Sequence, residues 1–162
     1  MIKFFYVSLA WVMLSLTDSV FWLLNPQKAI AGSCAITNTV GVSFGAYDVF
    51  SNTPTDAVGS VTYLCQDLGA GLITVDLSKG FSNTYNVRTL RSGGDNLNYN
   101  LYLDSGHNTI WGDGTEGSSR YGPLNPTNNS NIDLSIYGRI PARQTNTKVG
   151  NYSDTITVTI NF

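Results

Sequence analysis

Charged residues are scarce in this 162-residue sequence, at 12% of the total against roughly 25% in a typical soluble domain. The formal net charge is −2, and lysine and arginine form no cluster. The chain therefore lacks the basic surface that nucleic-acid binding requires. One histidine and two cysteines are too few for a tetrahedral zinc site, which usually takes four ligands. Hydrophobic residues make up 42%, which excludes wholesale disorder.

Motifs that carry chemistry are also missing. His107 shares a single turn with Asp104 and Ser105, and sequence neighbours in a turn rarely have the geometry of a catalytic triad. No glycine pattern of a nucleophile elbow occurs, and residues 112–117 lack the spacing of a calcium loop. We therefore expect a non-enzymatic protein without catalytic residues, metal ligands or a cofactor, in which His107 is a solvated loop residue.

The N-terminal segment has the pattern of a secretory signal peptide. A short basic region precedes an apolar run at residues 4–16, and Ala29-Ile30-Ala31 supplies the small-x-small pattern that a signal peptidase cleaves. Asp18 interrupts the apolar stretch, whereas a membrane-spanning helix needs about 20 consecutive apolar residues. We expect residues 1–31 to be removed on export through the periplasm. Residues 32–162 then form one secreted or surface domain without a transmembrane segment.

The two cysteines, Cys34 and Cys65, lie in the exported part of the chain. An even cysteine count in such a protein indicates a disulfide, and two cysteines allow only one pairing. A redox or catalytic thiol is the weaker interpretation, because no CxxC motif and no basic surroundings are present. Closing a loop of this length stabilises a fold by on the order of 3 to 4 kcal/mol.

Apolar and polar residues alternate with a period of two along most of the exported chain, which predicts β-strands. Glycine-, proline- and asparagine-rich turns separate the alternating segments, and no window of ten or more residues has the pattern of an amphipathic helix. Strands at this spacing are typical of an antiparallel immunoglobulin-like sandwich. The alternating segments are 34–44, 60–65, 73–77, 97–103, 132–140 and 152–162.

The last alternating segment presents four large apolar side chains on one face: Ile156, Val158, Ile160 and Phe162. A protein normally protects such an edge with charge, proline or a covering segment, and residues 155–162 carry none of these. Two interpretations follow. Either this strand lies inside the sheet of its own domain, or a strand of another chain pairs beside it.

A second candidate surface contains Trp111, Asp113 and Tyr121. Aromatic faces stack on the apolar faces of sugars, so these residues could line a carbohydrate-binding surface. A tryptophan packed at the end of a strand explains Trp111 equally well. The two interpretations differ in whether Trp111→Ala would abolish sugar binding while leaving the fold intact.

The order and spacing of several motifs resemble the spore coat protein U-like domain family, which includes subunits of archaic chaperone–usher pili. The resemblance covers residues 34–162, and its closing motif is the most specific. The matching elements are Cys34, residues 44–47, Cys65, residues 77–80, Arg88, residues 97–102, 111–114, 137–142 and 150–162.

This resemblance implies a pilin-like sandwich that lacks one strand. A periplasmic chaperone, and then another pilus subunit at the outer-membrane usher, would supply that strand, which is a form of β-augmentation. The resemblance makes Ile156, Val158, Ile160 and Phe162 candidates for the groove wall, and Cys34–Cys65 the family disulfide. Inserting four apolar side chains at about 1.5 to 3 kcal/mol each would contribute on the order of 6 to 12 kcal/mol, an upper estimate.

One departure from the family concerns the donor strand. A polymerising subunit needs an N-terminal extension with alternating apolar residues, but only Gly32 and Ser33 precede Cys34 after the predicted cleavage. We therefore expect a subunit that accepts a strand without giving one, as at the end of a fibre for adhesion or biofilm formation. The alternative functions are a free-standing carbohydrate-binding module and a coat protein.

Overall fold

The structure is a computed structural model that describes residues 31–162. This part of the chain contains eight β-strands and no helix, and thus none that could cross a membrane. The all-β prediction is confirmed. The strands are β1 (Ser33–Val40), β2 (Thr55–Gln66), β3 (Ile73–Leu77), β4 (Arg88–Ser92), β5 (Asp95–Tyr102), β6 (Tyr121–Leu124), β7 (Asn131–Ile140) and β8 (Val158–Asn161).

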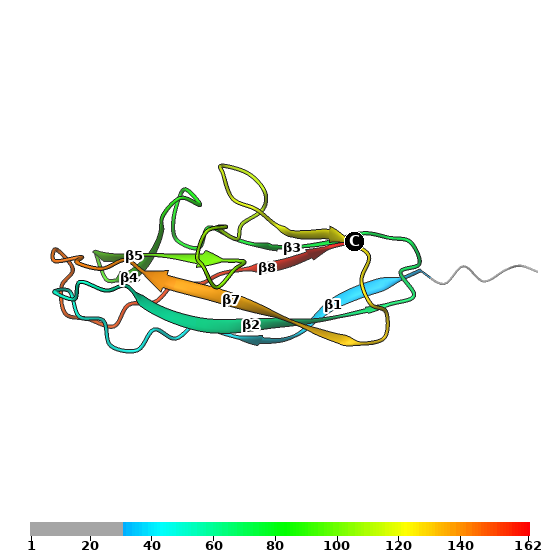
Figure 1. Cartoon of the computed structure of the whole chain (residues 1–162), viewed down its shortest axis with the longest axis horizontal. Coiled ribbons are helices and arrows are strands. Elements are labelled where there is room, and N and C mark those ends of the chain that lie inside the picture. Colours follow the sequence, from blue (N-terminus) through cyan, green and yellow to red (C-terminus); the bar gives the residue numbers. More distant parts are fainter. Residues whose placement is uncertain (1–30) are drawn as a thin grey trace, which may run out of the picture. The chain divides into compact units, whose positions relative to one another are not determined.

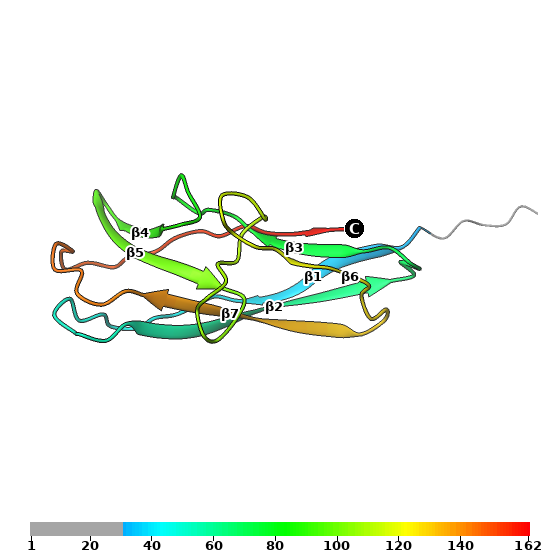
Figure 2. The ribbon, with the colours of Figure 1, turned by 45° about the horizontal axis from the view of Figure 1, so that its top comes forward.

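The strands form two antiparallel sheets that face each other (Figure 1). The larger sheet has the order β1-β2-β7-β5-β4, and the smaller one has the order β6-β3-β8. Figure 2 shows β3 of the smaller sheet lying over β1 and β2 of the larger one. This arrangement confirms the predicted antiparallel sandwich.

The hydrophobic core lies between the two sheets. Alternate side chains of β2, β3, β5 and β7 point into it, because successive residues of a strand face opposite sides. Trp111, from the segment between β5 and β6, is completely buried among them. The buried strand residues are Val61, Tyr63, Cys65, Ile73, Val75, Leu77, Leu97, Tyr99, Leu101, Leu134, Ile136 and Ile140.

The predicted disulfide between Cys34 and Cys65 is present. The two residues lie directly opposite each other in the antiparallel pairing of β1 with β2. Cys65 is completely buried, so the bridge ties the first strand to the centre of the larger sheet.

The structure differs from the predicted strands in three places. A register shift between Ile36 and Asn38 interrupts the alternation predicted for residues 34–44, so that Val40 at the end of β1 is 52% exposed. The last strand is continuous only over Val158–Asn161, although residues 152–157 continue its alternation of half-buried and exposed side chains and Ser153 forms an isolated bridge with Arg91. Finally, β4 and β6 have no clear alternation of apolar residues and were not predicted.

Candidate functional site

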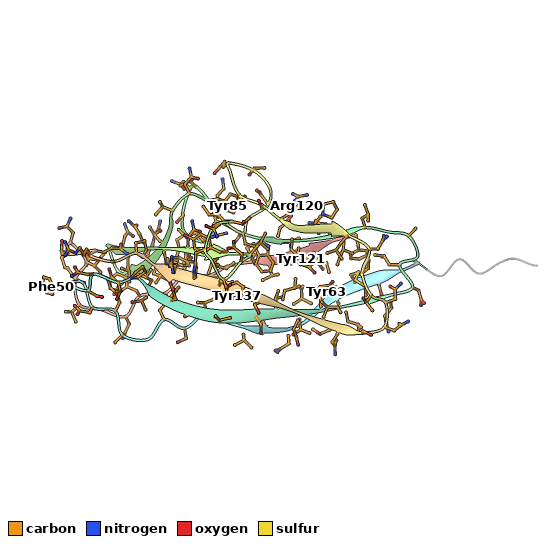
Figure 3. The ribbon with its side chains drawn as sticks, in the orientation of Figure 1. Phe50, Tyr63, Tyr85, Arg120, Tyr121 and Tyr137 are labelled. Atoms are coloured by element: carbon orange, nitrogen blue, oxygen red, sulfur yellow. A yellow bond between two sulfur atoms is a disulfide. The ribbon has the colours of Figure 1, made fainter. Side chains whose placement is uncertain are left out.

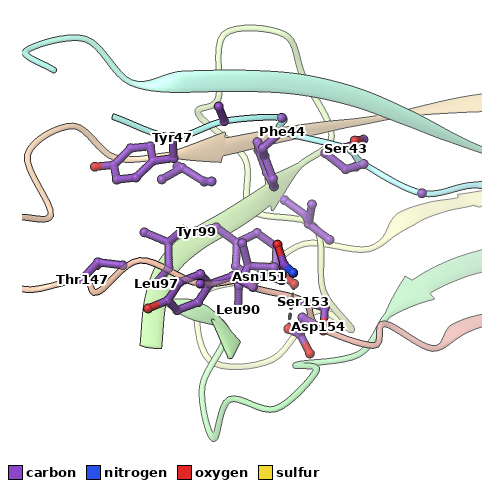
Figure 4. A pocket seen from close by; sticks show the side chains of 18 of the residues that line it. Ser43, Phe44, Tyr47, Leu90, Leu97, Tyr99, Thr147, Asn151, Ser153 and Asp154 are labelled. Carbon is purple, nitrogen blue, oxygen red and sulfur yellow. Dashed lines mark hydrogen bonds between the residues drawn. The ribbon is translucent and has the colours of Figure 1, made fainter. Parts of the chain in front are cut away.

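A long groove opens between two segments that continue the first and last strands. One wall is residues 41–50, which follow β1, and the other is residues 147–157, which lead into β8. The groove has a volume of about 1020 Å³. Figure 4 shows Phe44 and Tyr47 on one wall, with Thr147 and Asp154 on the other. At the end of the first wall, Phe50 is 77% exposed and projects outward (Figure 3).

The interior of the groove is apolar. Its floor consists of core residues of β5 and β7, and apolar side chains from both walls point toward it. The groove is therefore a part of the sandwich core that the described residues do not cover. Its apolar lining includes Val42, Phe44, Leu97, Tyr99, Leu101, Ile136, Ile140, Tyr152, Ile156 and Val158.

The main chain of both walls lacks the pairing expected of strands. Residues 41–47 form no backbone hydrogen bond with one another or with any other residue of 31–162. In the opposite wall the peptide groups of Tyr152, Asp154 and Ile156 are likewise without a backbone partner in this part of the chain. Peptide groups in such positions are normally paired, so both walls offer hydrogen bonds to a strand lying between them.

One glycine and one tyrosine position the first wall. A Cβ atom on Gly138 of β7 would lie 2.6 Å from Val42 Cγ1 and 2.7 Å from Phe44 Cζ, so glycine allows this wall to pack closely on the sheet. The Tyr47 hydroxyl donates to the Pro141 carbonyl over 2.7 Å. These contacts hold residues 41–50 over β7 although the wall has no strand partner within the described part of the chain.

The predicted groove residues divide into two pairs. Ile156 and Val158 line the groove, and their contact with a donated strand stays a prediction. Ile160 and Phe162 do not line it: Ile160 lies further along β8 and is half-buried against the core, and Phe162 is 60% exposed beyond the strand. Two of the four candidates thus face the groove.

Comparison with known proteins assigns the family. A sequence model of the Spore Coat Protein U domain matches residues 21–159. The chain belongs to the Spore Coat Protein U domain family. The match begins inside the predicted signal peptide, whose residues 1–30 lie outside the described part of the chain, so its cleavage remains a prediction. A search of curated proteins found no match.

A solved structure has the same fold as this Spore Coat Protein U domain. It is the crystal structure of the CsuC–CsuE chaperone–tip adhesion subunit pre-assembly complex from archaic chaperone–usher Csu pili of Acinetobacter baumannii. The TM-score is 0.54 at 24% sequence identity, over 83% of this chain and 41% of that chain. This chain thus spans less than half of the matched chain. The likeness supports a pilin-type sandwich, and family and fold together point to a structural protein.

The predicted carbohydrate surface of this Spore Coat Protein U domain is not available for stacking. Trp111 has no exposed surface, and its Nε1 donates to the Val75 carbonyl over 2.9 Å. Tyr121 is half-buried with its ring centroid 6.3 Å from that of Trp111. The Asp113 carboxylate accepts hydrogen bonds from the amide and hydroxyl of Thr115, and thus closes its own loop. Trp111 thus matches the second of the two interpretations that the sequence left open, a tryptophan packed in the fold.

Trp111→Ala is expected to destabilise the domain by about 3–5 kcal/mol, since it leaves a large cavity in the core. Urea unfolding measures this loss directly. Asp113→Asn changes the exposed loop beside it and serves as the control, with a much smaller effect. An unfolding midpoint unchanged by Trp111→Ala would contradict the core role of this residue.

His107 is not the solvated residue that the sequence predicts. Only 7% of its side chain is exposed, and its ring centroid lies 5.1 Å from that of Tyr102 and 6.5 Å from that of Tyr137. Its Nε2 is 3.8 Å from Asp56 Oδ1, and Asp56 also accepts two hydrogen bonds from Arg139. His107 therefore fastens its loop to the larger sheet. Among residues 31–162, no group of three or more acidic, histidine or cysteine side chains could hold a metal ion.

Two polar residues in the groove were missed by the sequence reasoning. Tyr99 forms part of the floor, and its hydroxyl donates to Asp154 Oδ2 over 2.7 Å (Figure 4). Burial, and then this hydrogen bond, raise the pKa of Tyr99 above its ordinary value, so the hydroxyl stays protonated and remains a donor. Tyr99 and Asp154 occupy inward positions of their alternating segments, which was the only signal in the sequence.

Proposed function

We propose that this protein is a structural or adhesive subunit of an exported surface fibre of the chaperone–usher type, and that its groove accepts a β-strand from another chain. The observation that supports this most is the open groove, where two segments with a strand-like sequence lie on either side of an exposed core without pairing to each other. The fold and the family are those expected for such a subunit.

The occupant that fits the groove is an extended strand with alternating apolar side chains. Its main chain would pair with the free peptide groups of the walls, and every second side chain would enter the apolar interior. About four inward side chains at about 1.5–3 kcal/mol each would stabilise the filled groove by on the order of 6–12 kcal/mol, as an upper estimate. Main-chain hydrogen bonds add to this.

The partners follow from the same proposal. A periplasmic chaperone would supply the first strand, and a neighbouring subunit would replace it at the outer-membrane usher, so the mature protein would be part of a fibre at the cell surface. A terminal position in the fibre stays a prediction of the sequence, because it depends on residues before Gly32, nearly all of which lie outside the described part of the chain. The carbohydrate-binding alternative loses its main support because Trp111 is buried.

Photo-crosslinking tests where the strand binds. The donor peptide is a synthetic peptide of about ten residues, in which isoleucine or valine alternates with threonine and lysines at the ends maintain solubility. With p-benzoylphenylalanine in place of Phe44, the periplasmic protein should crosslink to this peptide. The control is p-benzoylphenylalanine in place of Val58, a surface residue of β2 with 60% exposure. This variant should not crosslink to the peptide. Equal crosslinking from both positions would contradict binding in the groove.

A further inference from the structure

Residues 152–157 keep the form of a strand although no residue of 31–162 pairs with them on the groove side. Their side chains alternate between half-buried and exposed, as those of β8 do. Two anchors on the other side hold the ends of this segment. Ser153 exchanges backbone hydrogen bonds of 2.8 and 3.1 Å with Arg91 of β4. The carbonyl of Thr157 accepts from the Ser78 amide, and the Thr157 amide donates to Ser78 Oγ, both over 2.9 Å.

The Asp154 carboxylate is a third anchor, in the middle of the segment. Its Oδ1 accepts from the amides of Phe81 and Thr155 over 2.9 and 2.7 Å, and its Oδ2 accepts from the Tyr99 hydroxyl over 2.7 Å. Gly80 makes room for it, since a Cβ atom at this residue would lie 2.1 Å from Oδ2, and its φ of +64° also favours glycine. A carboxylate with three donors fixes this part of the main chain against the floor and the neighbouring loop.

Anchoring from one side decides which peptide groups face the groove. Along an extended chain, the peptide groups of successive residues point to opposite edges. Those of Ser153 and Thr157 point away from the groove and are paired, so those of Tyr152, Asp154 and Ile156 point toward it. The edge that would receive a strand thus already exists in the empty domain.

The same contacts reach the opposite wall. The Tyr99 ring packs edge-on against Phe44 of residues 41–50, with ring centroids 6.0 Å apart and an interplanar angle of 74°. Asp154 therefore orients Tyr99, and Tyr99 supports Phe44 across the floor. This connected set links both sides of the groove.

We propose that Asp154 is a positioning residue, which together with Tyr99 holds residues 152–157 as a preformed edge before a donor strand arrives. This inference rests on the proposed strand-accepting function. A preformed edge binds faster and more tightly than one that has to become ordered during binding, because less conformational entropy is lost.

Asp154→Asn tests the role of the carboxylate, because it keeps the shape but replaces one acceptor oxygen by a donor. We expect the Kd of the donor peptide to rise on the order of tenfold, which corresponds to a loss of about 1.4 kcal/mol of binding free energy. Association should also be slower. In the empty protein, the amides of residues 153, 155 and 157 should exchange hydrogen faster, whereas those of β2 and β7 should not change. Asp67→Asn removes a carboxylate from an exposed turn and is the matched control.

Tyr99→Phe provides a second variant, which removes the hydroxyl donor without a change of charge. It should slow association in the same way, and combining it with Asp154→Asn should add little, because both remove the same contact.

The outcomes separate this inference from the proposed function. If the unsubstituted protein ignores the donor peptide, both fail. If it binds the peptide but Asp154→Asn and Tyr99→Phe bind equally fast and equally tightly, the positioning role is wrong while the function stands. If the substitutions speed exchange throughout β2 and β7 as well, Asp154 supports the whole fold instead, which also overturns the inference.

Discussion

Val158→Asp is expected to abolish capture of the donor peptide. Val158 is half-buried, lines the groove and packs against the core. A carboxylate at this position would be covered by the incoming strand without a partner, and burying an unpaired charge costs several kcal/mol in addition to the lost apolar contacts of Val158. Capture is measured by a pull-down with immobilised donor peptide. A second readout is the amount of the variant that accumulates in the periplasm when a chaperone is co-expressed.

Thr157→Asp is the matched control for this prediction. The Thr157 side chain is exposed, and its two backbone hydrogen bonds to Ser78 do not involve the side chain that changes. Val42→Asp places a charge on the opposite wall, outside any strand, and should abolish capture even if Val158→Asp fails to fold. Equal capture by the Val158 and Thr157 variants would show that the assignment of the two faces is wrong.

Arg88→Ala is expected to prevent stable folding. Arg88 has no exposed surface, and its guanidinium donates to the carbonyls of Ser78 and Trp111 and to Asn100 Oδ1. Burial lowers the pKa of Arg88, but arginine remains protonated in proteins, so a full charge is held in the core by these acceptors. Removing it leaves the Ser78 and Trp111 carbonyls without a donor, at about 1–3 kcal/mol each, and also leaves a large cavity, whereas Asn100 Oδ1 still accepts from the Leu101 amide.

The expected loss is at least about 5 kcal/mol, which is comparable to the whole stability of many domains. Urea unfolding of protein purified from the periplasm measures it, with the yield of soluble protein as a second readout. Arg91→Ala, on the same strand, is the control. Arg91 is exposed and donates one hydrogen bond to the Phe81 carbonyl, so its removal should cost less than about 1 kcal/mol. Similar losses for the two variants would contradict the central role of Arg88.

The sequence predicts the core strands well because their inward faces are regular. In β2, for example, more exposed residues alternate with Val61 and Tyr63. In β3 they alternate with Val75 and Leu77. The two cysteines allow only one pairing, so the disulfide was predictable too. By contrast, β4 was missed because its buried residue is Arg88, and β6 because Gly122 and Pro123 have the pattern of a turn.

The groove could be predicted only in part. The period of the closing motif shows which side chains point inward, but not where along the segment a partner strand is missing. β3 pairs with β8 on the edge away from the groove, so which edge lacks a strand follows from the order of the strands in the sheets, and one segment of sequence does not give this order. The opposite wall was not predicted, because its position follows from the close approach of Val42 and Phe44 to Gly138, a contact distant in sequence.

Thermal unfolding with and without the donor peptide tests the central claim most directly. The full chain is expressed with its N-terminal segment, purified from a periplasm in the disulfide-bonded form without a chaperone, and followed by size analysis. Without the peptide, the protein is predicted to aggregate or to have a low melting temperature. With saturating donor peptide, it is predicted to be a monomer whose melting temperature is higher by on the order of 10 °C. A peptide of the same composition in scrambled order should have no effect. A stable monomer with the same melting temperature in all three conditions would show that the sandwich is complete without a donated strand.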